Sequence, residues 1–205
     1  MPRPSSRDAI LETAVQIASV QGLEGLSIGG LAAATQKSKG GICAHFPSKA
    51  DLQLAVVGRA AELFKQAVIV PTLRESPGLA RLERMIDAWF QYIQEGVFTG
   101  GCFFTNAALE LDDLETTDAV LSEIRKLYGD YLRFLERCIR DAIAEGNPDP
   151  ETDVELLAYE LHGLEAAALV RHALGEADAY STAARHARAL LSRHRLDGAR
   201  HQPES

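Results

Sequence analysis

Apolar residues recur at intervals of three and four along almost the whole chain, and this periodicity constrains the fold more than any other feature. Such spacing gathers apolar side chains on one face of an α-helix, whereas a half-buried strand needs strict alternation. No alternating run of strand quality occurs in the sequence. The 205 residues are 46% hydrophobic, enough to bury a sizeable core. The sequence therefore predicts an all-α protein of about nine helices.

Serine residues mark points in the first fifty residues where a helix can begin. A first helix is expected from Ser5 to Gly25. Two short helices follow, one capped by Ser27 and one, over residues 39–46, capped by Ser38. A helix followed by two short capped helices is the plan of a helix-turn-helix, whose last helix enters the major groove of DNA. We therefore expect a three-helix DNA-binding headpiece over residues 1–50.

Longer helices are predicted in the rest of the chain, each bounded by a proline, a glycine or a capping residue. Their expected spans are 48–70, 76–95, 103–109, 117–145, 149–175 and 178–195. The last residues, 199–205, are expected to be a disordered tail.

The net charge of −8 is unevenly distributed. Residues 1–50 carry +2 and the remainder carries −10. Phosphates would repel the acidic part, so contact with DNA is expected to be confined to the headpiece.

The sequence does not support a membrane span, a signal peptide or a zinc site. No apolar run approaches the ~20 residues needed to cross a bilayer, and the first residues lack the apolar stretch of a signal peptide. Cys43, Cys102 and Cys138 show no paired spacing for zinc. We expect a cytoplasmic protein with free thiols and with neither metal, cofactor nor membrane contact.

The headpiece contains short motifs at fixed spacings, namely Leu31-Ala32, Ser38-Lys39-Gly40, His45-Phe46-Pro47-Ser48-Lys49 and Leu52. Together they resemble the DNA-binding signature of the TetR family of bacterial repressors. The match covers residues 7–54, about a quarter of the chain. The rest of the chain is similar to the family only in length and helical content.

This resemblance implies DNA-binding roles for specific residues. Ser38 would cap the recognition helix, and Gly40 would let the backbone approach the duplex. His45 and Lys49 would contact phosphates. The full set expected at the DNA is Ser27, Lys37, Ser38, Lys39, Gly40, Gly41, Cys43, Ala44, His45 and Lys49.

Three positions depart from the family pattern. Gln36 stands where the family has Gly in the turn, although Gln is less comfortable at positive φ. Lys37 replaces a small buried aliphatic residue, so its side chain must snorkel or face the DNA. Cys43 replaces a phosphate-binding Tyr. Since few long side chains remain to read bases, we expect DNA shape and phosphate contacts to matter more.

Aromatic residues concentrate behind the headpiece, and Phe46 is the only one before residue 60. The resemblance implies that residues 51–198 enclose a pocket for a small apolar or aromatic effector, which releases the repressor from DNA. Such a pocket combines apolar walls with a few polar groups. The expected lining is Trp89, Phe90, Tyr92, Phe103, Phe104, Asn106, Glu110, Tyr128, Tyr131 and His162. Simple core packing of these residues is the alternative.

The predicted helices over 149–175 and 178–195 are apolar on broad faces. Two such helices from each subunit would form a four-helix interface around a two-fold axis, although they could instead simply close the monomer. A dimer places two recognition helices ~34–36 Å apart, which suits a palindromic operator. The expected contacts are Leu157, Leu161, Leu164, Ala168, Ala183, Ala187, Leu190 and Leu191.

Rival functions lack sequence support. An enzyme is not expected, because no phosphate-cradling glycine loop, nucleophile elbow or HExxH motif is present. A metal sensor would have to gather scattered residues such as Cys102, Cys138, His162 and His172. A helical small-molecule-binding protein or enzyme with a degenerate headpiece is the remaining alternative. The sequence favours a dimeric, ligand-responsive transcriptional regulator.

Overall fold

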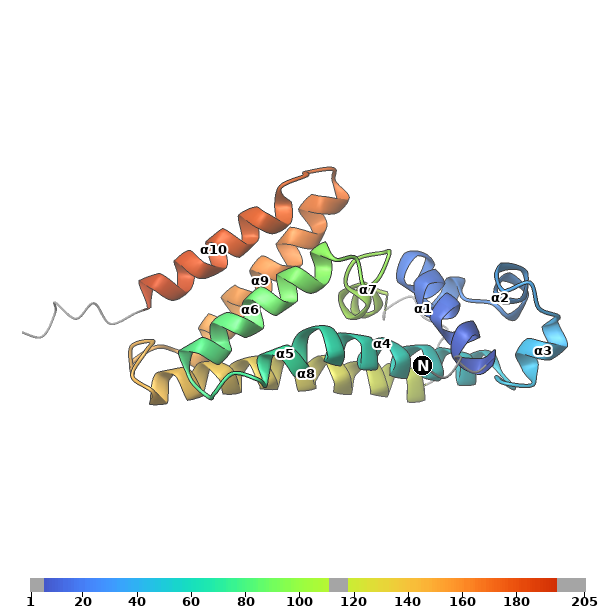
Figure 1. Cartoon of the computed structure of the whole chain (residues 1–205), viewed down its shortest axis with the longest axis horizontal. Helices are drawn as coiled ribbons and strands as arrows, with labels where there is room; N and C mark the ends of the chain where they lie inside the picture. The colour runs from blue at the N-terminus through green and yellow to red at the C-terminus, as the bar shows by residue number, and fades with distance from the viewer. Residues whose placement is uncertain (1–5, 111–117, 195–205) are drawn as a thin grey trace, which may run out of the picture. The chain divides into compact units, whose positions relative to one another are not determined.

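The structure is a computed structural model that describes residues 6–110 and 118–194. Within these residues every regular element is a helix, as the apolar periodicity predicted (Figure 1). The elements are α1 (Ser6–Gly25), α2 (Ile28–Ala34), α3 (Lys39–Cys43), α4 (Lys49–Phe64), the π-helix η1 (Lys65–Ile69), α5 (Val70–Thr72), α6 (Leu79–Gln94), α7 (Phe103–Leu109), α8 (Asp118–Ala144), α9 (Val154–Ala173) and α10 (Ala179–Arg193). The tail predicted over 199–205 lies outside the described residues.

The chain forms two compact units. The first unit comprises residues 1–65 and 96–129, and the second comprises residues 66–95 and 130–205. The boundaries between the units therefore fall inside η1, just after α6 between residues 95 and 96, and inside α8. The functional domains expected over 1–50 and 51–198 remain predictions.

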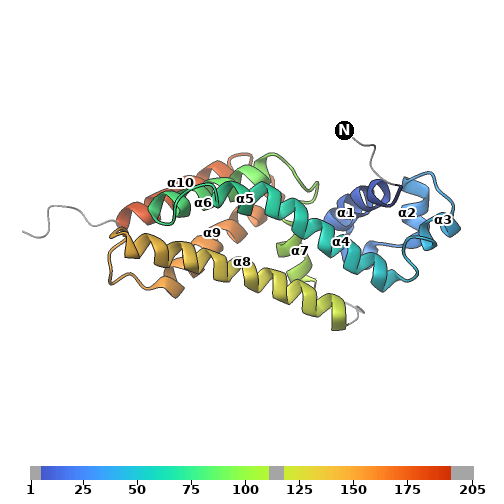
Figure 2. The ribbon, with the colours of Figure 1, turned by 60° about the horizontal axis from the view of Figure 1, so that its bottom comes forward.

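The first unit is built around α1, which packs against α2, α4 and α7 (Figure 2). Ile10 and Ala14 of α1 are fully buried, together with Leu31 of α2, Ile42 of α3 and Val56 of α4. Each fully buried Leu or Ile contributes roughly 1.5–3 kcal/mol. Because helices as short as α2 and α3 are unstable alone, this shared core is what holds them in place.

Serine caps begin α2, α3 and α4, as predicted, whereas Ser5, expected at the start of the first helix, lies outside the described residues. The hydroxyl oxygens of Ser27 and Ser38 accept hydrogen bonds from the third backbone N–H that follows each of them, both at 3.0 Å. Ser48 caps α4 in the same way at 3.1 Å. The third helix is shorter than the predicted 39–46, although Phe46 N still donates to Ile42 O at 3.0 Å.

The prediction that Pro71 stops the fourth helix is wrong, because the chain continues through η1 into α5. Pro71 lies in the first turn of α5, where a missing backbone N–H removes no helical hydrogen bond. The wider π turn directly before it absorbs the change in hydrogen-bonding register.

The predicted start of α6 at Ser76-Pro77 is also too early, because α6 is capped from outside the local sequence. Gly78 precedes the helix with φ 132, and a Glu145 carboxylate oxygen accepts from Leu79 N at 2.8 Å. A Cβ at position 78 would collide with that carboxylate. The local sequence around Ser76 gives no sign of a cap that comes from the end of α8.

Similarly, α9 begins at Val154 rather than at the predicted Asp149-Pro150. The Asp153 carboxylate accepts from Leu156 N at 3.0 Å, which caps the helix. Asp149 instead donates its backbone N–H to His194 O at 2.8 Å. The segment between the predicted and the observed start is therefore a turn.

The second unit contains α6, α9 and α10, with α10 packed on both of the others. Its core includes Trp89, which is 2% exposed, and Leu157, which is fully buried. The Arg188 guanidinium of α10 lies 2.6 Å from an Asp87 carboxylate oxygen of α6.

Gln36 has φ 55, the left-handed conformation in which a non-glycine residue costs about 1–2 kcal/mol. Replacing Gln36 by Gly should therefore raise the free energy of unfolding by about 1 kcal/mol, as measured by urea denaturation. Gln36→Ala keeps the Cβ and should bring no such gain. An equal gain in both variants would contradict backbone strain at this turn.

Candidate nucleic-acid interface

The residues predicted to contact DNA gather on the exposed side of α2, α3 and the start of α4. All ten are exposed except Gly41, which is half-buried. On the opposite side of α3, Ile42 and Phe46 are 0% and 1% exposed. The third helix therefore has one buried face and one solvent face, and Lys37 and Lys39 give the solvent side positive charge.

Gly40 is not required by the packing of the protein itself. A Cβ at this position would meet only the Ser38 hydroxyl, at 4.0 Å. At Gly41 the same oxygen would lie at 3.3 Å, so this glycine does help the cap to form. Position 40 thus leaves backbone open to solvent without any internal reason for a glycine.

Lys49 lies at the start of α4 but is already engaged within the first unit. Its ammonium lies 2.7 Å from a Glu24 carboxylate oxygen and donates to Glu24 O at 3.1 Å. Arg7, which sequence reasoning did not assign, places its guanidinium 5.1 Å from the centre of the Phe46 ring. The feature that could have assigned Arg7 to this surface is its exposed position in the first turn of α1.

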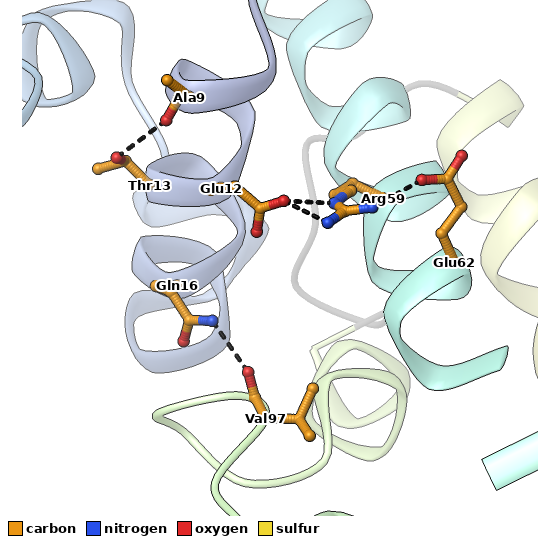
Figure 3. Close-up of polar contacts among 7 residues, drawn as sticks. All are labelled: Ala9, Glu12, Thr13, Gln16, Arg59, Glu62 and Val97. Atoms are coloured by element: carbon orange, nitrogen blue, oxygen red, sulfur yellow. Dashed lines mark hydrogen bonds and ion pairs between the residues drawn. The ribbon is translucent and has the colours of Figure 1, made fainter. Parts of the chain in front are cut away.

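Charged side chains join α1 to α4 (Figure 3). The Arg59 guanidinium donates from Nε to Glu12 at 2.7 Å and from another nitrogen to Glu62 at 2.9 Å. A cleft of about 440 Å³ between the two helices has these three side chains in its lining. Further along α1, Gln16 donates to Val97 O at 2.9 Å.

Two of the predicted ligand contacts, Asn106 and Glu110, form hydrogen bonds that hold α1. Asn106 donates to Gly100 O at 2.8 Å and to Ser19 O at 3.4 Å. A Glu110 carboxylate oxygen accepts from Leu23 N at 3.1 Å. Burial raises the pKa of Glu110, and the hydrogen bond from Leu23 opposes that rise. Their ligand roles remain predictions.

The ten predicted ligand residues are divided equally between the two units. The first unit contains Phe103, Phe104, Asn106, Glu110 and Tyr128, and the second contains Trp89, Phe90, Tyr92, Tyr131 and His162. The rings of Trp89 and Phe90 pack edge to face at 5.2 Å, and those of Phe103 and Phe104 do so at 5.4 Å.

A buried polar cluster in the second unit includes a residue that sequence reasoning missed. Glu165 of α9 is 5% exposed. It accepts a hydrogen bond from the Tyr131 hydroxyl at 2.5 Å and lies 3.0 Å from His162 Nδ1. Burial raises the pKa of Glu165, although His162 and Tyr131 act to lower it. In the sequence, only the spacing of three residues between His162 and Glu165 indicates that the two side chains could meet on one helical face.

Seven of the eight predicted dimer contacts are buried within one chain, and Leu164 is half-buried. Another face of α9 is exposed, where Tyr159 and Leu174 are each 78% exposed and Leu156 and Val170 are 54% and 56% exposed. The predicted contacts contribute little surface to a partner, so their dimer role remains a prediction.

The described residues contain neither a metal-binding cluster nor a membrane-spanning helix. Among residues 6–110 and 118–194, no group of three or more His, Cys, Asp or Glu side chains is placed to hold a metal ion. None of the helices in the same ranges is long and apolar enough to cross a membrane.

Two family models match the chain. Residues 10–56 match the model described as "Bacterial regulatory proteins, tetR family". Residues 78–187, more than half of the chain, match "Tetracyclin repressor-like, C-terminal domain". The chain belongs to the TetR family. It is therefore a transcription regulator rather than an enzyme, and it carries a DNA-binding helix-turn-helix.

Solved structures of other proteins, including TetR transcriptional regulators, have the same fold. One from Chloroflexus aurantiacus is 25% identical with a TM-score of 0.81, and the alignment covers 92% of this chain and 95% of that one. A regulator from Saccharomonospora viridis in complex with choline is 18% identical, with a TM-score of 0.75 and coverage of 93% and 97%.

A third structure, AibR in complex with isovaleryl coenzyme A and operator DNA, is 19% identical with a TM-score of 0.70 and coverage of 92% and 97%. No curated protein sequence matches this chain.

The Glu165 cluster of this TetR-family chain makes stability depend on pH. Since its pKa is raised above the ordinary 4.5, the folded state binds the proton more tightly than the unfolded state. The stability that Glu165 contributes is present below pH 4.5 and is lost as the pH rises through the raised pKa. Glu165→Gln should therefore gain stability relative to the natural protein as the pH rises, and the gain should be larger near neutrality than below pH 4.5.

Urea denaturation at several pH values measures this difference. Glu160→Gln is the matched control, because Glu160 is exposed on the same helix. A difference between the natural protein and Glu165→Gln that stays constant with pH would contradict the assignment.

Proposed function

We propose that this TetR-family protein is a homodimeric repressor. In this proposal it binds a palindromic operator through α2, α3 and the start of α4, and a small effector releases it from the DNA.

The observation that carries the DNA-binding proposal is the solvent face of α3. Together with Lys37 in the preceding turn, this face combines Lys39 with a Ser38-capped helix start and an exposed glycine. Cations and free amides at a helix start attract phosphates. Gly40 supports the same proposal, because its missing side chain serves no internal contact but would permit close approach of the backbone to the duplex.

A second copy of the chain is the partner that we propose for the exposed face of α9. Leu156, Tyr159, Val170 and Leu174 fall on one helical stripe, and Gly163 and Ala167 lie between them. The small residues would allow a partner helix to approach closely. The large apolar side chains would then be buried away from water, which stabilises the contact. This face is a more specific candidate for dimerisation than the buried residues that the sequence suggested.

The second unit supports an effector site. It combines the aromatic side chains of α6 with a buried carboxylate–hydroxyl–imidazole cluster, and ligand pockets pair apolar walls with few polar groups. Glu165 and His162 would orient a ligand that Trp89 and its neighbours enclose. The choline and isovaleryl coenzyme A complexes of similar regulators support a small-molecule effector but do not identify it.

Gly40→Ala should separate stability from DNA binding. A Cβ is tolerated in the free protein, so the variant should gain about 0.5–1 kcal/mol of stability. The same Cβ would separate the backbone from the duplex and lower DNA affinity by about tenfold, which corresponds to a loss of about 1.4 kcal/mol. Denaturation and fluorescence anisotropy with labelled duplex DNA measure the two effects.

Gly58→Ala is the control for Gly40→Ala, because a Cβ on this exposed glycine of α4 meets nothing within 4 Å. It should gain stability and keep DNA affinity. Equal DNA affinities for the two variants would count against α3 as the recognition helix.

Val170→Glu should dissociate the dimer. A carboxylate buried without a partner costs several kcal/mol, so the dimer Kd should rise by about a hundredfold or more. Sedimentation velocity measures this shift, and Ala144→Glu, on an exposed residue of α8, is the control that should remain dimeric. A Val170→Glu variant as dimeric as the natural chain would exclude this face.

A further inference from the structure

The C-terminal end of α1 is held by side chains from two other helices of the first unit. From α4, the Gln53 amide donates to Leu23 O at 3.0 Å, and Lys49 donates to Glu24 O at 3.1 Å. From α7, Glu110 accepts from Leu23 N at 3.1 Å. The N–H of Leu23 is therefore bound by a side chain, and its C=O by a side chain together with Leu26 N at 3.4 Å.

The local sequence makes this arrangement possible. Gly22 has φ 75, which breaks the helical ladder and turns the polar groups of the next residues outward. A Cβ on Gly22 would collide with the Glu110 carboxylate. Lys49 and Gln53 are one turn apart on α4, so both side chains face the end of α1.

Lys49 therefore has two competing partners. Its ammonium gives two hydrogen bonds to Glu24, including one to the carboxylate at 2.7 Å, yet its place at the start of α4 is where the proposed function requires a phosphate contact. The Lys49 and Glu24 side chains are 45% and 36% exposed, so solvent and a phosphate can both reach the pair. Two of the three N–H groups of the ammonium are bound by Glu24, and the paired carboxylate offsets the positive charge that attracts a phosphate.

We propose that Glu24 is a positioning residue for DNA binding, which holds Lys49 against the end of α1 in the free protein and yields it to a DNA phosphate in the complex. This inference rests on the proposed function, because it concerns the same DNA-binding surface. It makes Glu24 an internal competitor of the operator.

The exchange also affects the contact between α7 and α1. Burial raises the pKa of the Glu110 carboxyl, the hydrogen bond from Leu23 opposes that rise, and the negative charge of Glu24 adds to it. When Lys49 moves to a phosphate, Glu24 loses a neutralising cation and repels Glu110 more.

The test is a double-mutant cycle measured by fluorescence anisotropy on duplex DNA. Glu24→Gln should bind DNA about two- to fivefold more tightly than the natural protein, as expected for release of an exposed ion pair. In a Lys49→Met background the same substitution should bring no gain. Glu123→Gln is the matched control, since Glu123 also pairs with a lysine, Lys126, at 3.4 Å on α8. It should leave affinity unchanged.

The salt dependence tests the phosphate contact separately. Lys49→Met should lower the slope of log affinity against log salt by about one, because one phosphate contact is lost. An unchanged slope would overturn the exchange of partners. Glu24→Ala provides a second variant, and it should behave like Glu24→Gln because both lack the carboxylate.

The remaining outcomes are distinct. A gain that persists without Lys49 would show plain repulsion of DNA by Glu24, and no gain or a loss would also overturn the inference. If the natural protein itself binds no DNA, the proposed function fails and this inference fails with it. Binding by the natural protein, with equal affinity of all Glu24 variants, overturns the inference alone.

Discussion

The packing of α1 against three helices is the constraint on which the DNA-binding surface depends. The short helices α2 and α3 cannot persist alone, so their orientation follows from the apolar face that they share with α1 and α4. Polar contacts then fix the end of α1, where the Leu23 peptide is bound by Gln53 on one side and by Glu110 on the other. A change in either contact alters the support of the recognition helix.

Local signals in the sequence predict much of this arrangement. The caps Ser27, Ser38 and Ser48 lie where their hydroxyls meet the third following amide, and the apolar periodicity separates buried Ile42 from exposed Lys39. The strain expected at Gln36 is present as a positive φ. These features depend on residues within one turn of one another, which is why the sequence alone identifies them.

Contacts between distant parts of the chain explain what the sequence could not predict. Glu145 caps α6, and Glu110 caps a break in α1 from 87 residues away. Glu165 is buried because Tyr131 and His162 provide partners, although an isolated Glu on a helix is usually solvated. In α9, all-round apolarity concealed which face is buried, so the exposed stripe became visible only in the structure.

The most direct test of the account is selection of binding sites from random duplex DNA by the purified full-length protein. A dimer with two α3 helices predicts enrichment of a near-palindrome whose half-sites are centred about one helical turn, ~34–36 Å, apart. Retention of the DNA should also fall steeply with salt. No enrichment at low salt, or enrichment of a single half-site without a symmetric partner, would contradict the dimeric operator-binding account.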